Sequence, residues 1–141
     1  MKRNNKGFTL IELLAVIVIL AVIALIATPI IMGVINNAKS GADKDSAYGI
    51  VKTLETAIAQ KMIDDPNFAV PASCTIASNG SNCTYTPAGG GDSVVINIDY
   101  KGTKPTGGEI KFNTAKGSVD KDSTVIMPTG TFTMQANGEF K

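Results

Sequence analysis

The sequence Lys6-Gly7-Phe8-Thr9-Leu10-Ile11-Glu12 leads directly into an apolar run from Leu13 to Ala27, which resumes at Ile30-Ile31-Met32. As a helix, residues 8–35 measure about 42 Å at about 1.5 Å per residue. That length exceeds the hydrocarbon core of a bilayer, which is about 30 Å thick. We therefore predict a membrane-spanning helix over residues 8–36, preceded by a short leader over residues 1–7.

Charges on the two sides of this helix predict its orientation. Lys2, Arg3 and Lys6 precede it, whereas the charges that follow, at Lys39, Asp43, Lys44 and Asp45, nearly cancel. Because the more basic flank stays in the cytoplasm, we expect a cytoplasmic N-terminus and an exported domain over residues 37–141. The alternative is a cleaved secretory signal, which needs an apolar core of about 7–15 residues and an A-x-A-like site. The apolar run here is longer, and its alanines never stand two apart.

Glu12 is the only charged residue in the predicted helix. A carboxylate near the centre of a membrane helix costs about 2.5–3.5 kcal/mol, but the helix dipole lowers that cost at the N-terminal end. Two interpretations follow. Glu12 is either an ordinary acid in the first turn or a group that pairs with a positive charge during assembly.

The composition argues against an enzyme and against a metal or other cofactor. The chain has no His and only two Cys. Histidine is the commonest general base and metal ligand, and a structural zinc site needs four N or S ligands. Outside the first seven residues, acidic side chains slightly outnumber basic ones, so a nucleic-acid partner is not expected.

Beyond residue 37 the pattern predicts an α+β domain. Apolar residues with helical spacing predict an amphipathic helix over residues 43–63, continuous or nearly so with the membrane helix and ended by Asp64-Asp65-Pro66-Asn67. Residues 67–92, rich in Pro, Gly and Ser, are predicted as loop. Alternating and β-branched residues then predict strands at 94–100, 109–113, 124–127, 131–134 and 139–140. We expect an antiparallel meander of three to five strands covering one face of the helix.

Cys74 and Cys83 lie within the predicted loop. Outside the membrane a disulfide between them is the favoured state, and closing so short a ring stabilises by about 2–3 kcal/mol. Free thiols, or one cysteine paired with a partner protein, are the alternatives.

Residues 6–12, followed by Leu13-Leu14-Ala15-Val16-Ile17, resemble the prepilin signature of type IV pilins and their pseudopilin relatives. The resemblance covers residues 1 to about 55 and implies a pilin fold, with a long helix packed on an antiparallel sheet. It also implies that a prepilin peptidase cuts between Gly7 and Phe8 and methylates the new amino terminus of Phe8. The subunit would then enter a helical homo-oligomeric filament through a pilus assembly platform and its ATPase machinery.

The same resemblance gives roles to two residues of the helix. Glu12 of an incoming subunit would neutralise the Phe8 ammonium of a subunit already in the filament, because both charges are unfavourable alone in an apolar bundle. Pro29 cannot donate the helical hydrogen bond, and we predict that it kinks or opens the helix locally. In resembling pilins it bounds a stretch that unwinds on packing. Many relatives carry glycine where this chain has Ala21.

The function predicted from the sequence is that of a structural subunit of a type IV pilus. It would be a single-pass membrane protein before assembly and a surface fibre afterwards, serving adhesion, twitching motility or aggregation. One alternative is a pseudopilin of a type II secretion system. Such pseudopilins use a calcium-binding loop, but Asp120-Lys121-Asp122-Ser123 supplies only part of the ligand set that calcium prefers. Another is a competence pilin for DNA uptake, which would need a basic stripe from the lysines at 101, 104, 111, 116 and 121.

Overall fold

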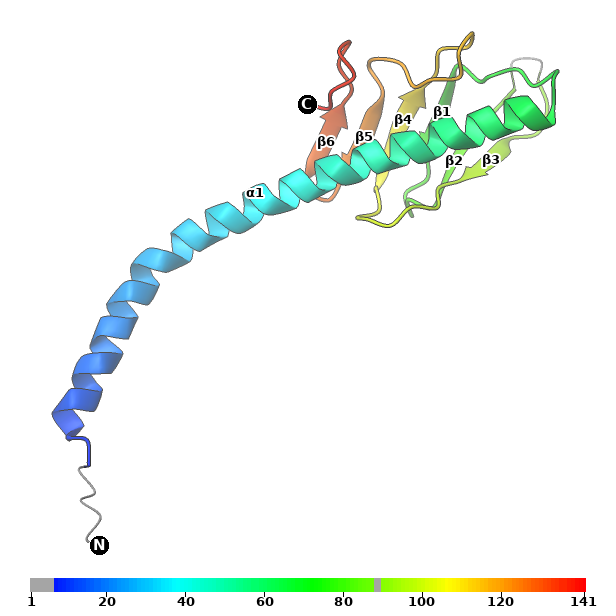
Figure 1. Ribbon diagram of the computed structural model, residues 1–141. Coiled ribbons are helices and arrows are strands. Elements are labelled where there is room, and N and C mark those ends of the chain that lie inside the picture. Colours follow the sequence, from blue (N-terminus) through cyan, green and yellow to red (C-terminus); the bar gives the residue numbers. More distant parts are fainter. Residues whose placement is uncertain (1–6, 88–89) are drawn as a thin grey trace, which may run out of the picture. The chain divides into compact units, whose positions relative to one another are not determined.

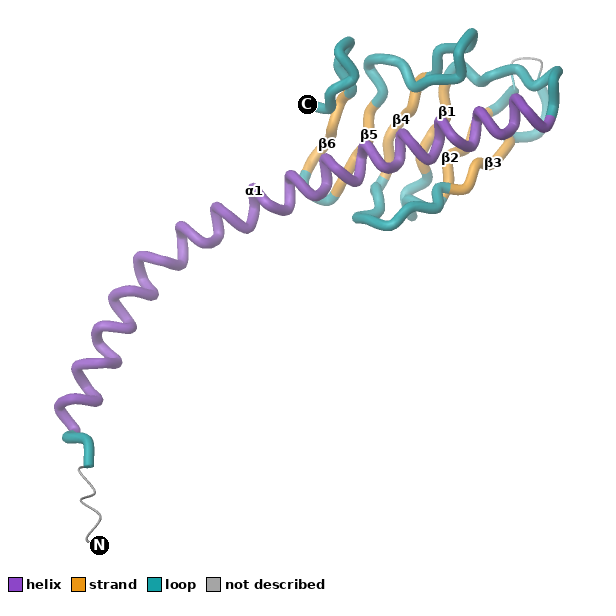
Figure 2. The backbone as a smooth tube through the Cα atoms, viewed as in Figure 1, coloured by secondary structure: helices purple, strands orange, loops and turns teal. Residues whose placement is uncertain are grey.

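The structure is a computed structural model that describes residues 7–87 and 90–141. The chain divides into two compact units, Met1–Ala38 and Lys39–Lys141. One helix, α1 (Leu10–Asp64), contributes to both units, and all strands belong to the second (Figures 1 and 2). The predicted leader lies outside the described residues, except for Gly7.

The described part of the first unit is an apolar helix with no core of its own. From Gly7 to Ala38 every side chain except that of Ala27 is exposed. This helix is long and apolar enough to cross a membrane. A continuous apolar surface of this kind is stable in water only when lipid or protein covers it.

In the second unit α1 is amphipathic, as the spacing of its apolar residues predicts. Its buried positions are Asp43, Ala47, Ile50, Val51, Leu54 and Ile58. Met62, which continues the same stripe, is 39% exposed. The helix ends at Asp64, where a turn follows in which the Phe68 N–H donates to the Asp65 carbonyl at 2.9 Å.

In the described part of the chain, six antiparallel strands form one sheet against this helix. They are β1 (Ser73–Ile76), β2 (Asn82–Tyr85), β3 (Val94–Asn97), β4 (Gly107–Lys111), β5 (Thr124–Met127) and β6 (Gly130–Thr133). Their order is β3-β2-β1-β4-β5-β6, so two three-stranded meanders meet where β1 pairs with β4. Figure 1 shows α1 crossing one face of the sheet, with the strands succeeding one another along the helix.

The α+β class is confirmed, but two details predicted from the sequence are wrong. Residues 67–92 are not all loop, because they contain β1 and β2, and the sheet has six strands rather than three to five in one meander. Both missed strands have only four residues, and half of those are Ser, Thr or Asn. Such short segments, placed among Pro and Gly, resemble loops when only the sequence is read.

The later strands lie close to their predicted positions. β5 has the predicted bounds, and β4 and β6 begin one or two residues early. β3 ends at Asn97 rather than continuing to Tyr100. After the turn at Asn137-Gly138, residues 139–140 form only an isolated bridge between Met134 and Phe140.

The core lies between α1 and the inner face of the sheet. Side chains with no exposed surface come from both layers and include Ile50, Leu54, Ile58, Ile110 and Val125. The Phe140 ring packs edge-on against Tyr48 with ring centroids 5.1 Å apart. The helix and sheet therefore bury each other's apolar faces, as expected for an amphipathic helix on an antiparallel sheet.

Four connecting segments are also tied to α1 by backbone amides that donate to helix side chains. The four donor and acceptor pairs are Thr129 N–H to Asp43, Thr103 N–H to Ser46, Phe140 N–H to Tyr48, and Val119 N–H to Glu55, at 2.9–3.1 Å. Sequence reasoning missed these contacts because the partners lie 57–92 residues apart along the chain.

Candidate functional site

The start of α1 is organised by Thr9 and Glu12. The Glu12 carboxylate accepts hydrogen bonds from the Thr9 N–H and the Thr9 hydroxyl, both at 2.8 Å. In return the Glu12 N–H donates to the Thr9 hydroxyl oxygen at 3.3 Å. This reciprocal arrangement is a capping box, in which residues three apart satisfy the free amides of a helix start. The T-x-x-E spacing before an apolar run is the sequence signal that could have revealed it.

The Thr9 N–H and the Thr9 hydroxyl donate to the same oxygen of Glu12, namely Oε2. Among the described residues, no basic group lies within ion-pair distance of this carboxylate. The structure thus gives Glu12 a local role at the helix start and leaves Oε1 without a protein partner in that part of the chain.

Gly7 and Phe8 precede the helix in an irregular, exposed segment. The Phe8 side chain is 84% exposed. A Cβ added to Gly7 would meet no atom of the described chain within 4 Å. Crowding by the described residues therefore does not require glycine at this position.

Pro29 lies inside α1, and the helix continues through it without a break. Next to it, the Thr28 hydroxyl donates to the Ala24 carbonyl at 2.7 Å. Hydroxyl bonds of this type to the preceding turn are a common adjustment near membrane prolines. No local opening of the helix is present in the described chain, and unwinding at Pro29 on assembly stays a prediction.

Cys74 and Cys83 form a disulfide between neighbouring strands β1 and β2. Both are essentially buried, with 1% and 0% of their surface exposed. Thr75 pairs with Thr84 and Ile76 with Cys83, so the cysteines are diagonal neighbours on the inner face of the sheet. The disulfide thus closes a hairpin of the core rather than a surface loop.

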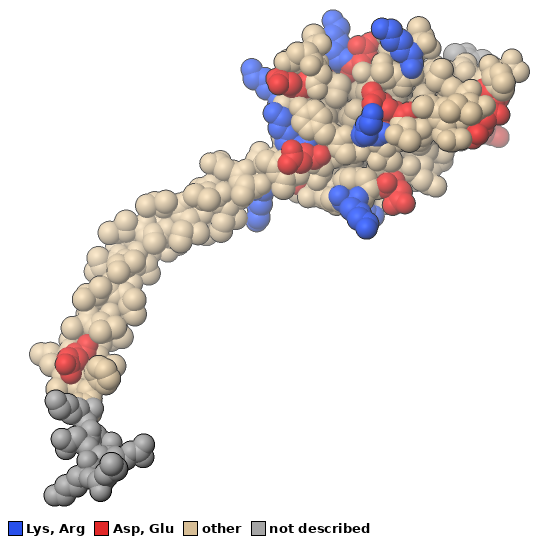
Figure 3. Space-filling view, viewed as in Figure 1, with Lys and Arg blue, Asp and Glu red and all other residues tan. Residues whose placement is uncertain are grey.

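Charged side chains of the second unit are of mixed sign. On the face seen in Figure 3, Lys and Asp or Glu side chains are interspersed rather than gathered in a stripe. Asp120 accepts a hydrogen bond from the neighbouring Lys121 N–H, and Asp122 has a left-handed backbone with φ 61°. Within residues 7–87 and 90–141, no three His, Cys, Asp or Glu side chains converge on a point that could hold a metal ion.

Comparison with known proteins agrees with this geometry. Residues 2–28 match the family described as "Prokaryotic N-terminal methylation motif". The chain is 37% identical over 68 residues to type II secretion system core protein G of Dickeya chrysanthemi, covering 48% of this chain and 42% of that protein. It is 40% identical over 63 residues to prepilin peptidase-dependent protein A of Clostridium perfringens, covering 44% and 45%. No solved structure matches significantly.

These matches make the chain similar to prepilin-like proteins, the pilins and pseudopilins. The chain matches the family model over residues 2–28 and each of these relatives over less than half of its own length.

Proposed function

We propose that this chain is a fibre subunit that is cut between Gly7 and Phe8, methylated on Phe8, and polymerised through its N-terminal helix. The observation that carries the proposal is the described helix from Leu10 to Ala38. It exposes nearly all its apolar side chains and carries one carboxylate, in its first turn. A membrane covers this surface before assembly, and the helices of neighbouring copies would cover it in a fibre.

The cleavage site fits the local geometry. A peptidase needs an accessible, non-helical bond, and the bond between Gly7 and Phe8 lies in an exposed segment just before the helix. A side chain at position 7 would meet no atom of the described chain, so we attribute the glycine to recognition at the peptidase. Residues 1–6 of the leader lie outside the described residues, so this step rests on the sequence and on the motif match.

Cleavage would create an ammonium group on Phe8, directly before the capping residue Thr9. An ammonium and a carboxylate are both costly in an apolar bundle, and pairing them between neighbouring copies relieves both costs. In the single chain, Glu12 uses only Oε2 for the cap. Its other oxygen is therefore available to an ammonium on the next subunit, which would fix the register between subunits.

The fibre we favour is a type IV pilus, in which the exported unit supplies the surface for adhesion, twitching motility or aggregation. Its partners would be a prepilin peptidase, an assembly platform with its ATPase, and further copies of the chain. Similarity to core protein G of Dickeya chrysanthemi and of Aeromonas hydrophila favours a second candidate, a pseudopilus of a type II secretion system. A competence fibre would need a basic stripe, for which the interspersed charges of Figure 3 give no support.

The proposal is tested by counting fibres on cells that express Glu12→Ala or Glu12→Gln in place of the natural chain. Glutamine can complete a capping box as glutamate does, but it cannot neutralise an ammonium. We expect both variants to accumulate as cleaved membrane protein and to form few or no fibres.

The Gln variant separates the two roles of Glu12. If Glu12→Gln assembles normally and Glu12→Ala does not, Glu12 is a capping residue and its charge has no part in assembly. Normal fibres from both variants would refute the pairing altogether.

A further inference from the structure

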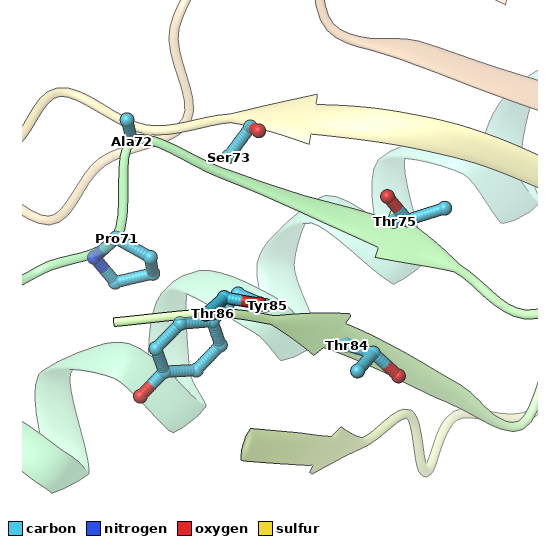
Figure 4. Close-up of a pocket in the computed structure, with 7 residues that line it drawn as sticks. All are labelled: Pro71, Ala72, Ser73, Thr75, Thr84, Tyr85 and Thr86. Atoms are coloured by element: carbon cyan, nitrogen blue, oxygen red, sulfur yellow. The ribbon is translucent and has the colours of Figure 1, made fainter. Parts of the chain in front are cut away.

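The face of the sheet opposite α1 carries a groove of about 520 Å³ over β1 and β2. It is lined by Pro71, Ala72, Ser73, Thr75, Thr84, Tyr85 and Thr86 (Figure 4). Side chains alternate along these strands, so Cys74 and Cys83 face the core while Thr75 and Thr84 face outward. Ser73, Thr75, Thr84 and Tyr85 belong to the paired strands β1 and β2, and the other three lining residues flank these strands.

Five lining residues carry a side-chain hydroxyl, and the four that are exposed or half-exposed are Ser73, Thr75, Thr84 and Thr86, whereas Tyr85 is buried. Within the described part of the chain, none of the four makes a hydrogen bond to another protein group. Other hydroxyls of the same sheet are used internally: the Ser123 hydroxyl donates to the Asp120 carbonyl at 2.7 Å, and the Thr124 hydroxyl accepts from the Glu109 N–H at 3.2 Å. The groove thus presents hydroxyl donors and acceptors that have no protein partner among the described residues.

Strand pairing arranges these hydroxyls in a grid. Thr75 lies directly opposite Thr84, and such cross-strand neighbours have Cβ atoms about 4.5–5.5 Å apart. Ser73 and Thr75 are two residues apart on one strand, which corresponds to about 6.7 Å. Each hydroxyl can both donate and accept, so the grid suits a ligand that carries regularly spaced hydroxyl groups.

None of the described residues that line the groove is charged. The nearest charges along the strand register are on β4, where Glu109 lies opposite Thr75 and Lys111 lies opposite Ser73. Their opposite signs cancel at this rim, so neither an anionic nor a cationic ligand is matched. The remaining lining surface comes from Pro71, Ala72, Tyr85 and the threonine methyl groups.

From this combination we propose that the groove binds a segment of an uncharged polysaccharide. Sugar rings present hydroxyls at their edges and C–H groups on their faces, which match the hydroxyl grid and the apolar patches between its members. Binding would attach the exported unit to a neutral glycan surface. The proposal concerns the folded unit alone and does not depend on assembly of a fibre.

The test is a titration of the full chain, ¹⁵N-labelled and held in a detergent without a sugar headgroup, because maltoside detergents would compete. The probes are cellohexaose, maltohexaose and chitohexaose, with hexagalacturonic acid as the charged counterpart. We expect at least one neutral hexasaccharide to bind with a Kd below about 5 mM. Its addition should shift the amide resonances of residues 73–75 and 84–86.

The decisive variant is Thr75→Val with Thr84→Val, which removes two hydroxyls and keeps the β-branched shape that the strands favour. We expect it to weaken binding by about tenfold or more, since each lost hydrogen bond is worth a several-fold change in affinity. The matched control is Thr131→Val with Thr133→Val on β6, which lies outside the groove and should leave affinity unchanged.

Three results would overturn the proposal. The first is the absence of binding by all three neutral probes up to about 10 mM. The second is equal binding by the Thr75→Val, Thr84→Val variant and the natural chain. The third is a preference for hexagalacturonic acid, which would show that the ligand is recognised by charge.

Discussion

The disulfide between Cys74 and Cys83 should be a main contributor to the stability of the second unit. The bond joins β1 to β2, which make up one side of the sheet together with β3. Reducing it removes no atom from the core, so its effect isolates the covalent link. Because both cysteines are buried, the bond has to be reduced in denaturant before the chain is refolded.

The size of the effect follows from the ring that the bond closes. The two cysteines are separated by 9 positions, and closing a ring of about ten residues lowers the entropy of the unfolded chain by an amount worth about 2.7 kcal/mol at 25 °C. With a urea m-value of about 1–3 kcal/mol/M, the urea concentration at the unfolding midpoint should fall by about 0.9–2.7 M.

Tyrosine fluorescence gives a direct assay, because the chain has no Trp and only three Tyr. Tyr48, Tyr85 and Tyr100 all lie in the second unit, so their emission reports on that unit and not on the apolar first unit. Oxidised and reduced chains are unfolded in urea in the same detergent. The Cys74→Ala, Cys83→Ala variant serves as the control, and its midpoint should not change on addition of reductant.

If reduction lowers the free energy of unfolding by less than about 1 kcal/mol, this prediction is wrong. Such a result would mean that the reduced unfolded chain already holds the ends of the hairpin together. Failure of the reduced chain to fold at all would also contradict it, since ring closure alone cannot account for so large an effect.

Three further predictions use the same unfolding assay. Asp43→Ala should cost about 2–3 kcal/mol, because Thr129 would lose the acceptor of its N–H and hydroxyl. Asp43→Asn, which keeps an acceptor, should cost less. Tyr100→Phe should be neutral or stabilising by up to about 1 kcal/mol, since the buried Tyr100 hydroxyl has no partner among the described residues. Burial of the Tyr100 side chain, and to a smaller extent the negative charge of Asp43, raise the pKa of Tyr100. The natural chain should therefore lose stability as the pH rises above about 10. The Tyr100→Phe variant should lose less. Gly108→Ala should cost more than about 2 kcal/mol, because its Cβ would lie 2.3 Å from the Thr124 carbonyl at φ 137°.

The parts of the fold that could be predicted from the sequence are those with a repeated local signal. The apolar run marks the first helix, and the spacing of Ala47, Ile50, Leu54 and Ile58 marks its continuation. Val125 and Met127 alternate with exposed residues in β5, which lies where expected. Each of these signals depends only on neighbours within one or two turns of helix or along one strand.

The parts that could not be predicted depend on contacts between distant residues. β1 and β2 are stabilised as strands by pairing with β4 and β3 and by the disulfide, not by their own composition. In the sequence Asp43 is one of several charges near the start of the second unit. In the structure it is buried, and Thr129 supplies donors to it from 86 residues away. At the candidate site, the charge of Glu12 marks this residue in the sequence. The cap that it forms with Thr9 could also have been predicted, because the two residues are only three apart.

The central claim is that the chain is processed at its leader and incorporated into a fibre. The most direct measurement is intact mass and N-terminal sequencing of protein sheared from the cell surface. We expect a chain that begins at N-methylated Phe8 and contains the Cys74–Cys83 disulfide. A chain that still carries Met1 to Gly7, or protein that is found only in the membrane, would contradict it.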